Sequence, residues 1–178
     1  MKIKTLIHTA LVAEAKPIIG YFGLTCKAKQ PYNLYENEDI ALIVSGMGEM
    51  STKAALTYAL TLFQPQVAIN VGMAGCTDKS VTKGTLFCTT HPDLGIPFTT
   101  LSSYQGAVDN TLHVTTTLVD MEAEGFLEVV PKGVKTYVFK IVSDHCDGGI
   151  PSKMDVGNWI NKSLKFWGKY GERSNITF

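Results

Sequence analysis

The sequence predicts an α/β domain with three layers, in which a mixed central sheet is flanked by helices. Apolar segments typical of strands alternate along the chain with segments of helical periodicity. The strand segments are almost continuously apolar, as in sheets that are covered on both faces. The length of 178 residues, with 45% hydrophobic and 18% charged residues, is that of a globular domain. Because no repeat, low-complexity tract or linker interrupts the chain, we assign residues 1–178 to a single domain.

The first half of the chain begins with a strand and a helix. Pro17 is tolerated only in the first turn of this helix, because proline lacks the N–H that later turns require. A polar stretch at Thr25–Asn37, broken by Gln30-Pro31, is expected to form a hairpin or an irregular excursion. The regular elements predicted here are a strand at Lys2–Thr9, a helix at Ala13–Tyr21, a strand at Asp39–Ser45 and a helix from Glu49 to Phe63.

The second half continues the alternation after Pro65, which ends the preceding helix. The turn-rich segment HPDLGIP separates two short strands. The elements predicted here are strands at Val67–Val71, Thr85–Thr90 and Phe98–Ser103, a helix at Val119–Val129, a strand at Thr136–Val142 and a helix at Ser152–Gly168. The strand at Thr136–Val142 is expected to lie in the centre of the sheet and to end at Ser143-Asp144.

Glycine or polar residues follow several of the predicted strands. In open α/β sheets, ligands bind beyond the carboxyl ends of the strands, so these segments are candidates for one shared rim. They are Ala10–Glu14, Ser45–Gly48, Gly72–Gly75 and Ser143–Asp144. Gly46-x-Gly48 and Gly72-x-x-Gly75 would let backbone N–H groups approach an anion or sugar hydroxyls; a tight turn without a ligand is the other reading. Neither segment has the terminal Gly-Lys-Ser/Thr of a Walker A loop or matches the dinucleotide fingerprint.

Three acidic residues stand out near this rim. Glu14 follows the first strand by about one helical turn, and Asp144 follows an apolar run. Glu122 lies near a helix start that Asp120 or Thr117 would cap, so a favourable interaction with the helix dipole explains it equally well. A turn or cap role is the simpler reading for Asp144. Together the three would supply a general acid, a sugar-hydroxyl acceptor and a base, which are the groups that cleavage of a glycosidic bond requires.

Charge and hydropathy exclude several kinds of partner. The formal net charge is zero, so no overall field attracts nucleic acid or an anionic membrane. No segment reaches the roughly 18 uninterrupted apolar residues of a membrane span. The N-terminal apolar stretch is interrupted by His8 and Thr9 and followed by Glu14, which indicates a strand leading into a helix rather than a signal peptide.

The cysteines and histidines indicate neither a disulfide framework nor a metal site. Cys26, Cys76, Cys88 and Cys146 are widely spaced and form no C-x-x-C pair, which is typical of reduced thiols and predicts a cytoplasmic protein. The four histidines show neither an H-E-x-x-H motif nor zinc-finger spacing. We therefore expect no metal and no cofactor.

Five short motifs in order resemble the nucleoside phosphorylase / methylthioadenosine–S-adenosylhomocysteine nucleosidase superfamily. They are ALVAEAKP, SGMGEMSTKAA, PQVAINVGMAG, VDMEAEGF and KIVSDHCD, and together they span roughly residues 3 to 147. The resemblance implies an α/β sandwich around a mixed sheet, a nucleoside as substrate with water or phosphate as the second reactant, and assembly as a homodimer or a higher homo-oligomer.

The resemblance also implies roles for individual residues. Glu122 matches the glutamate that accepts hydrogen bonds from the ribose 2′- and 3′-hydroxyls, and Met121 matches the residue packed beneath the sugar. Asp144 matches the acid that protonates or hydrogen-bonds purine N7, and Glu14 matches the glutamate that positions and deprotonates the attacking water. The other positions expected to line the substrate site are Gly46, Met73, Ala74, Gly75, Lys140 and Ser143.

The sequence departs from the family pattern in two places. The phosphorylases clamp phosphate with arginines and a serine of the G-x-A-G segment, but here Met73 occupies the serine position and the single arginine is Arg173. Lys140 stands where nucleosidases usually have arginine, and lysine supplies charge without the planar fork. The stretch between Gly75 and Glu122, which in relatives contributes a strand and a loop that stacks on the purine, is shorter here. Hydrolysis is therefore favoured; a phosphorylase with an unusual anion site and a non-catalytic nucleoside-binding protein are the alternatives.

Overall fold

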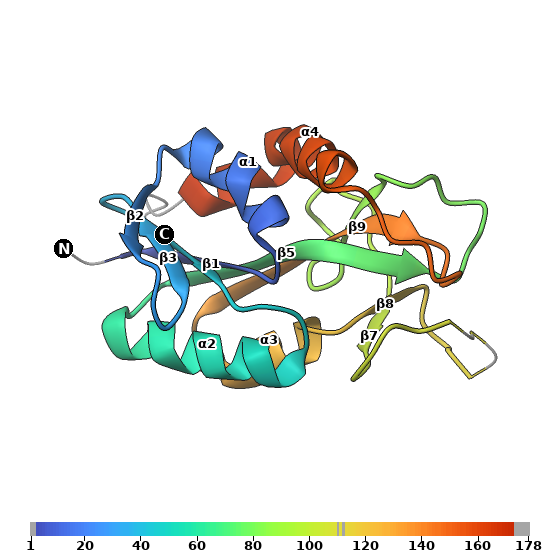
Figure 1. Ribbon diagram of the computed structural model, residues 1–178, viewed down its shortest axis with the longest axis horizontal. Helices are drawn as coiled ribbons and strands as arrows, with labels where there is room; N and C mark the ends of the chain where they lie inside the picture. Colours follow the sequence, from blue (N-terminus) through green and yellow to red (C-terminus); the bar gives the residue numbers. More distant parts are fainter. Residues whose placement is uncertain (1–2, 110, 112, 173–178) are drawn as a thin grey trace.

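The computed structural model describes residues 3–109, 111 and 113–172. Within these residues nine strands form one sheet, and helices cover both of its faces (Figure 1). The elements in chain order are β1 (Thr5–Thr9), α1 (Val12–Phe22), β2 (Thr25–Ala28), β3 (Asn33–Glu36), β4 (Ile40–Val44), α2 (Glu49–Leu62), β5 (Val67–Cys76), β6 (Leu86–Cys88), β7 (Leu101–Ser103), β8 (Leu118–Asp120), α3 (Ala123–Val129), β9 (Lys135–Asp144) and α4 (Lys153–Glu172).

The sheet is mixed, as the sequence predicts. Its path runs β2-β3-β4-β1-β5-β8-β7, and β9 pairs with β5 and with β6. Strands β4, β1, β5 and β9 are parallel neighbours, whereas β2 and β3 form an antiparallel hairpin, which is one of the two forms expected for the polar stretch. The long strand β5 lies between β1 and β9, so its carboxyl end is near the centre of the sheet edge where β1 and β4 also end.

The two faces of the sheet bury separate apolar clusters, because successive side chains of a strand point to opposite faces. Helices α1 and α4 cover one face and helices α2 and α3 cover the other (Figure 1). The first cluster includes Ile7, Ile18, Leu42, Phe139 and Trp167, and the second includes Leu6, Ile43, Leu56, Phe126 and Val138. These layers confirm the predicted fold class.

The segment Gly72–Gly75 lies within β5, not in a loop after it as the sequence suggested. The segment pairs with β9 along one edge, and at Gly75 and Cys76 the other edge pairs with β8. A Cβ on Gly75 would lie 3.0 Å from both the Cys146 sulfur and a Val119 methyl group. Glycine is therefore required here by close packing within the sheet rather than by a turn. Ser143 and Asp144 likewise belong to β9.

The predicted helix at Val119–Val129 begins too early. Leu118–Asp120 form the buried strand β8, and the helix starts only at Ala123, whose N–H donates a 2.9 Å hydrogen bond to Asp120 Oδ2. Pro17 also departs from the expectation, since it lies in the second turn of α1, where its missing N–H leaves the Ala13 carbonyl without the usual helical donor. Packing of α1 against the core outweighs this local cost.

Candidate active site

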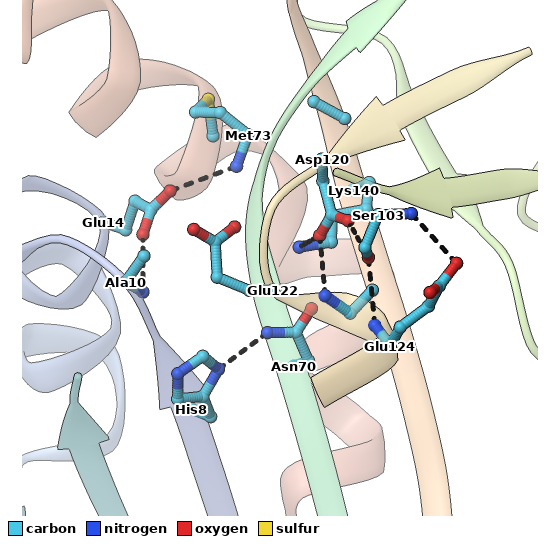
Figure 2. Close-up of polar contacts among 12 residues, drawn as sticks. His8, Ala10, Glu14, Asn70, Met73, Ser103, Asp120, Glu122, Glu124 and Lys140 are labelled. Carbon is cyan, nitrogen blue, oxygen red and sulfur yellow. Dashed lines mark hydrogen bonds and ion pairs between the residues drawn. The ribbon is translucent and has the colours of Figure 1, made fainter. Parts of the chain in front are cut away.

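Glu14 is fixed where α1 begins, at the carboxyl end of β1. Its side chain is buried, and its Oε2 accepts hydrogen bonds from the N–H groups of Ala10 (3.0 Å) and Leu11 (2.9 Å). Its Oε1 accepts a third bond from the N–H of Met73 in β5 (3.1 Å; Figure 2). Three backbone donors, two from the turn between β1 and α1 and one from β5, therefore hold this carboxylate in one orientation at the sheet edge.

The environment of Glu14 raises the pKa of its carboxyl group above the ordinary value. Burial is the largest cause, and the nearby Glu122 carboxylate acts in the same direction. The hydrogen bonds from Leu11 and Met73 and the charge of Lys140 oppose the shift without cancelling it. A carboxylate with a raised pKa is a stronger base than an exposed one, which suits it to accepting a proton.

This shift predicts how stability depends on pH. A carboxyl with a raised folded pKa binds its proton more tightly in the folded state, so the stabilisation is present below the unfolded pKa and is lost as pH rises through the folded pKa. Between the unfolded and the folded pKa of Glu14, the free energy of unfolding of the wild type should fall by about 1.4 kcal/mol per pH unit relative to that of Glu14→Gln. Urea unfolding between pH 4 and pH 8 measures it, with exposed Glu128→Gln as the control. Parallel curves for wild type and Glu14→Gln would contradict the raised pKa.

Gly72 makes room for two charged groups above β5. A Cβ at this position would lie 3.2 Å from Glu14 Oε1 and 3.5 Å from Lys140 Nζ. The absence of a side chain at Gly72 therefore lets the carboxylate from α1 and the ammonium from β9 approach each other over the strand.

Lys140 and Asp120 form a buried ion pair beside Gly72. Their Nζ–Oδ2 distance is 2.6 Å, with side-chain exposures of 1% and 0%. Burial lowers the pKa of Lys140, but the carboxylates of Asp120, Glu122 and Glu14 outweigh it and raise the pKa overall, so the lysine stays charged. Asp120 Oδ1 also accepts a 2.5 Å hydrogen bond from Ser103 Oγ (Figure 2). The charge of Lys140 therefore balances the buried carboxylates of Asp120, Glu122 and Glu14.

Glu122 lies between Glu14 and the Asp120–Lys140 pair in Figure 2. Its Oε1 accepts a 2.8 Å hydrogen bond from the N–H of Gly48, and its side chain is buried. Gly48 has a φ of 96°, a backbone conformation that favours glycine. The structure thus brings together Glu14, Glu122 and Lys140, which the sequence singled out separately.

Asp144 is the last residue of β9 and is half-buried. Its Oδ2 accepts a 2.6 Å bond from Ser143 Oγ, and its Oδ1 accepts a 2.8 Å bond from the N–H of Cys146. A Cβ atom added to Gly75 would lie 3.1 Å from Asp144 Oδ1. Asp144 therefore lies beside the carboxyl end of β5, and its hydrogen bonds are to its own neighbours in the chain.

The remaining predicted positions lie around this edge. Met73 and Met121 are half-buried, and the Met73 side chain packs against the core cluster under α1 and α4. Ala74 and Ser143 are buried, and Gly46 is exposed, with its N–H donating to the Ala10 carbonyl (3.0 Å).

Sequence reasoning missed most of the polar residues that support these acids. Asp120 was considered only as a helix cap, although a lone lysine in the apolar run YVFKIV signals a need for a buried partner. The N–H of Ser103 donates to Glu124 Oε1 (3.1 Å), and the Ser103 hydroxyl accepts from the N–H of Glu124 (3.0 Å; Figure 2). No sequence pattern indicated Ser103, because its partners are distant in the chain.

The described part of the chain contains no cluster of three or more His, Cys, Asp or Glu side chains arranged to hold a metal ion. All four cysteines are free thiols, and burial raises the pKa of Cys146 to about 11. None of the helices among the described residues has the length and apolar character needed to cross a membrane. The single arginine, Arg173, lies outside the described residues.

Comparison with known proteins finds similarity in structure. No protein-family model matches the chain, and no curated protein sequence matches it. A Helicobacter pylori MTAN solved with 5′-methylthioadenosine in its active site superposes with a TM-score of 0.80 at 17% identity, covering 97% of this chain and 99% of that chain. A Helicobacter pylori futalosine hydrolase gives 0.80 at 16% identity, with coverages of 96% and 99%.

An Arabidopsis thaliana 5′-methylthioadenosine nucleosidase in apo form gives a TM-score of 0.80 at 17% identity and covers 98% of each chain. Two of these neighbours are 5′-methylthioadenosine nucleosidases and the third is a futalosine hydrolase. The structural match extends over almost the full length of each protein compared. The chain therefore has the fold of the methylthioadenosine nucleosidases.

Proposed function

We propose that this protein hydrolyses the N-glycosidic bond of a purine nucleoside or 5′-thionucleoside through an oxocarbenium-like ribosyl transition state. The observation that carries the proposal is the buried Glu14 carboxylate, held by three backbone N–H groups beside Glu122 at the carboxyl end of the central strands. Ligands of α/β sheets bind at this edge, and the fold shared with nucleosidases supports the same location.

Glu14 is the proposed general base. Its fixed carboxylate would accept a proton from a water molecule as that water attacks the anomeric carbon, while the C–N bond to the purine breaks and its electron pair leaves with the base. The raised pKa favours this proton transfer near neutral pH. Asp144 is the proposed acid, donating a proton or a hydrogen bond to purine N7 so that the base leaves as a neutral heterocycle.

Glu122 is the proposed ribose ligand. Its Oε1 already accepts a hydrogen bond from the N–H of Gly48. We propose that its Oε2 accepts hydrogen bonds from the ribose 2′- and 3′-hydroxyls, with Met121 packed beneath the sugar. A carboxylate there also stabilises the positive charge that develops on the ribose. Lys140, fully buried against Asp120, would act by fixing these acids rather than by binding an anion. Gly46, Ala74, Gly75 and Ser143 would complete the walls of the site.

Water is the proposed second reactant in preference to phosphate. Phosphate recognition by planar, bidentate contacts requires arginine, and the single arginine is near the C-terminus. Met73 offers no hydroxyl, and its N–H already donates to Glu14. Both features disfavour an oxyanion beside β5.

The proposal is tested by incubating the protein with methylthioadenosine, adenosine and inosine, with and without phosphate, and reading free base by chromatography. We expect release of free base at the same rate in both conditions. Release only with phosphate would identify a phosphorylase and overturn the hydrolase. If no nucleoside is cleaved, calorimetry on Glu122→Gln and Asp144→Asn decides whether nucleosides bind, and unchanged binding in both variants would remove the proposed site.

We also propose that the protein is a cytoplasmic homodimer or higher homo-oligomer. Large apolar side chains are exposed at the sheet edge that carries the site, among them Leu11, Val12, Met47 and Met50, and clustered exposed apolar groups are typical of interfaces. Four free cysteines are typical of a reducing compartment. Light scattering on the purified protein gives the number of subunits, and a monomer at all concentrations would contradict the oligomer.

A further inference from the structure

His8 is a fully buried histidine on the face of β1 that points toward α2 and α3, where its ring stacks on Phe126 at 6.1 Å between centroids. Asn70 Nδ2 lies 2.7 Å from His8 Nδ1, and Ser45 Oγ lies 2.8 Å from His8 Nε2. Burial and the nearby charge of Lys140 lower the pKa of His8 to about 3, so the ring is neutral in the physiological range. A neutral ring that accepts from Asn70 at Nδ1 carries its hydrogen on Nε2 and donates it to Ser45.

The chain of hydrogen bonds continues from Ser45 into the loop before α2. Ser45 Oγ donates to the carbonyl of Gly46 over 2.6 Å. The N–H groups of Ser45 and Gly46 donate to the carbonyls of Thr9 (3.1 Å) and Ala10 (3.0 Å). The loop then reaches Gly48, whose N–H holds Glu122 Oε1. His8 is thus connected, through side-chain and backbone bonds, to the donor that orients Glu122.

The two carboxylates depend on β1 in different ways. Glu14 is held by backbone N–H groups of Ala10, Leu11 and Met73. Glu122 is held by a glycine loop that has a side-chain contact from His8 at its beginning. Removing the His8 ring should therefore release the loop and Glu122 while leaving Glu14 in place.

We propose that His8 is a positioning residue for ribose recognition: through Ser45 it fixes the 45–48 loop and thereby the orientation of Glu122. The ribose part of this inference rests on the proposed nucleoside hydrolysis. The positioning part concerns the Gly48–Glu122 hydrogen bond itself and is measured without substrate.

The test compares His8→Leu with His8→Gln. Glutamine can accept from Asn70 with its oxygen and donate to Ser45 with its amide nitrogen, whereas leucine fills the space without either bond. In His8→Leu the Gly48 amide should exchange its hydrogen about tenfold faster, because the loop loses its contact through Ser45. The Met73 amide should be unchanged, because the bond lost on β5 is to the Asn70 side chain and the Met73 N–H keeps its bond to Glu14. Hydrogen exchange followed by NMR reads both amides in the same sample.

With substrate, His8→Leu should lower kcat/KM about tenfold, because a displaced Glu122 binds the ribose less well and stabilises its developing positive charge less, while the Glu14 base stays in place. The preference for a ribonucleoside over its 2′-deoxy analogue should fall by a similar factor. His8→Gln should restore both values to within about threefold of the wild type.

Two further variants keep the test decisive. Thr5→Val removes a buried hydrogen bond to the Gly171 carbonyl at the other end of β1, and it should change neither Gly48 exchange nor the ribose preference. Ser45→Ala, at a half-buried position, removes the same connection and replaces His8→Leu if that variant does not fold. Unchanged Gly48 exchange, or an unchanged ribose preference, in His8→Leu or Ser45→Ala would overturn the proposal. A wild type that cleaves no nucleoside overturns the proposed function, and Gly48 exchange then still decides whether His8 positions Glu122.

Discussion

Replacement of Glu14 by glutamine is expected to lower kcat for nucleoside hydrolysis by about 10²–10⁴-fold, the usual contribution of a positioned general base. The amide keeps the size of the side chain but cannot accept the proton of the attacking water. Since Glu14 is proposed to act on water rather than on the sugar, KM should change little. Steady-state kinetics on the nucleoside that is cleaved fastest measures both constants.

The pH profile supplies a second check on Glu14. Because burial raises its pKa, wild-type kcat should increase with pH through this raised pKa, and the residual activity of Glu14→Gln should lack that limb. Glu128→Gln, an exposed change on α3, serves as the control and should behave as the wild type. Activity of Glu14→Gln within tenfold of the wild type would show that another group activates the water.

Replacement of Lys140 by methionine is expected to destabilise the fold by about 3–5 kcal/mol, the usual cost of removing one partner from a buried ion pair. Methionine fills similar space but leaves the Asp120 carboxylate, whose side chain is fully buried, without its counter-ion. Glu122 and Glu14 lose the same nearby cation. Urea unfolding at pH 7 measures the free energy of unfolding directly.

The double variant Asp120→Asn with Lys140→Met should recover much of this loss, because the asparagine carries no charge that needs compensation. Lys53→Met is the matched control, since Lys53 pairs with Glu49 and Glu128 near the surface, where ion pairs contribute little. A Lys140→Met variant as stable as the wild type would mean that the buried acids take up protons instead of requiring the lysine.

Local sequence patterns predicted the regular elements well where each element is stabilised by its own residues. The helix expected from Glu49 to Phe63 is α2 at Glu49–Leu62, and the strand expected at Asp39–Ser45 is β4 at Ile40–Val44. The errors occur where distant pairing overrides local preference. Gly72–Gly75 has the composition of a turn but lies in β5. Val119 and Asp120 were assigned to a helix but belong to β8, which pairs with β5 and β7.

The sequence by itself determined the alternation of strands and helices, and it singled out Glu14, Glu122 and Asp144 as the acids of the proposed site. Backbone preferences and hydrophobic periodicity act over a few residues, so they are readable along the chain. Only the tertiary structure decided what surrounds those acids. The N–H of Met73 donates a hydrogen bond to Glu14, which is 59 residues away in the sequence. The N–H of Gly48 donates one to Glu122, which is 74 residues away. Burial together with contacts between distant segments sets the charge and orientation of these groups, and no local pattern specifies which segments will meet.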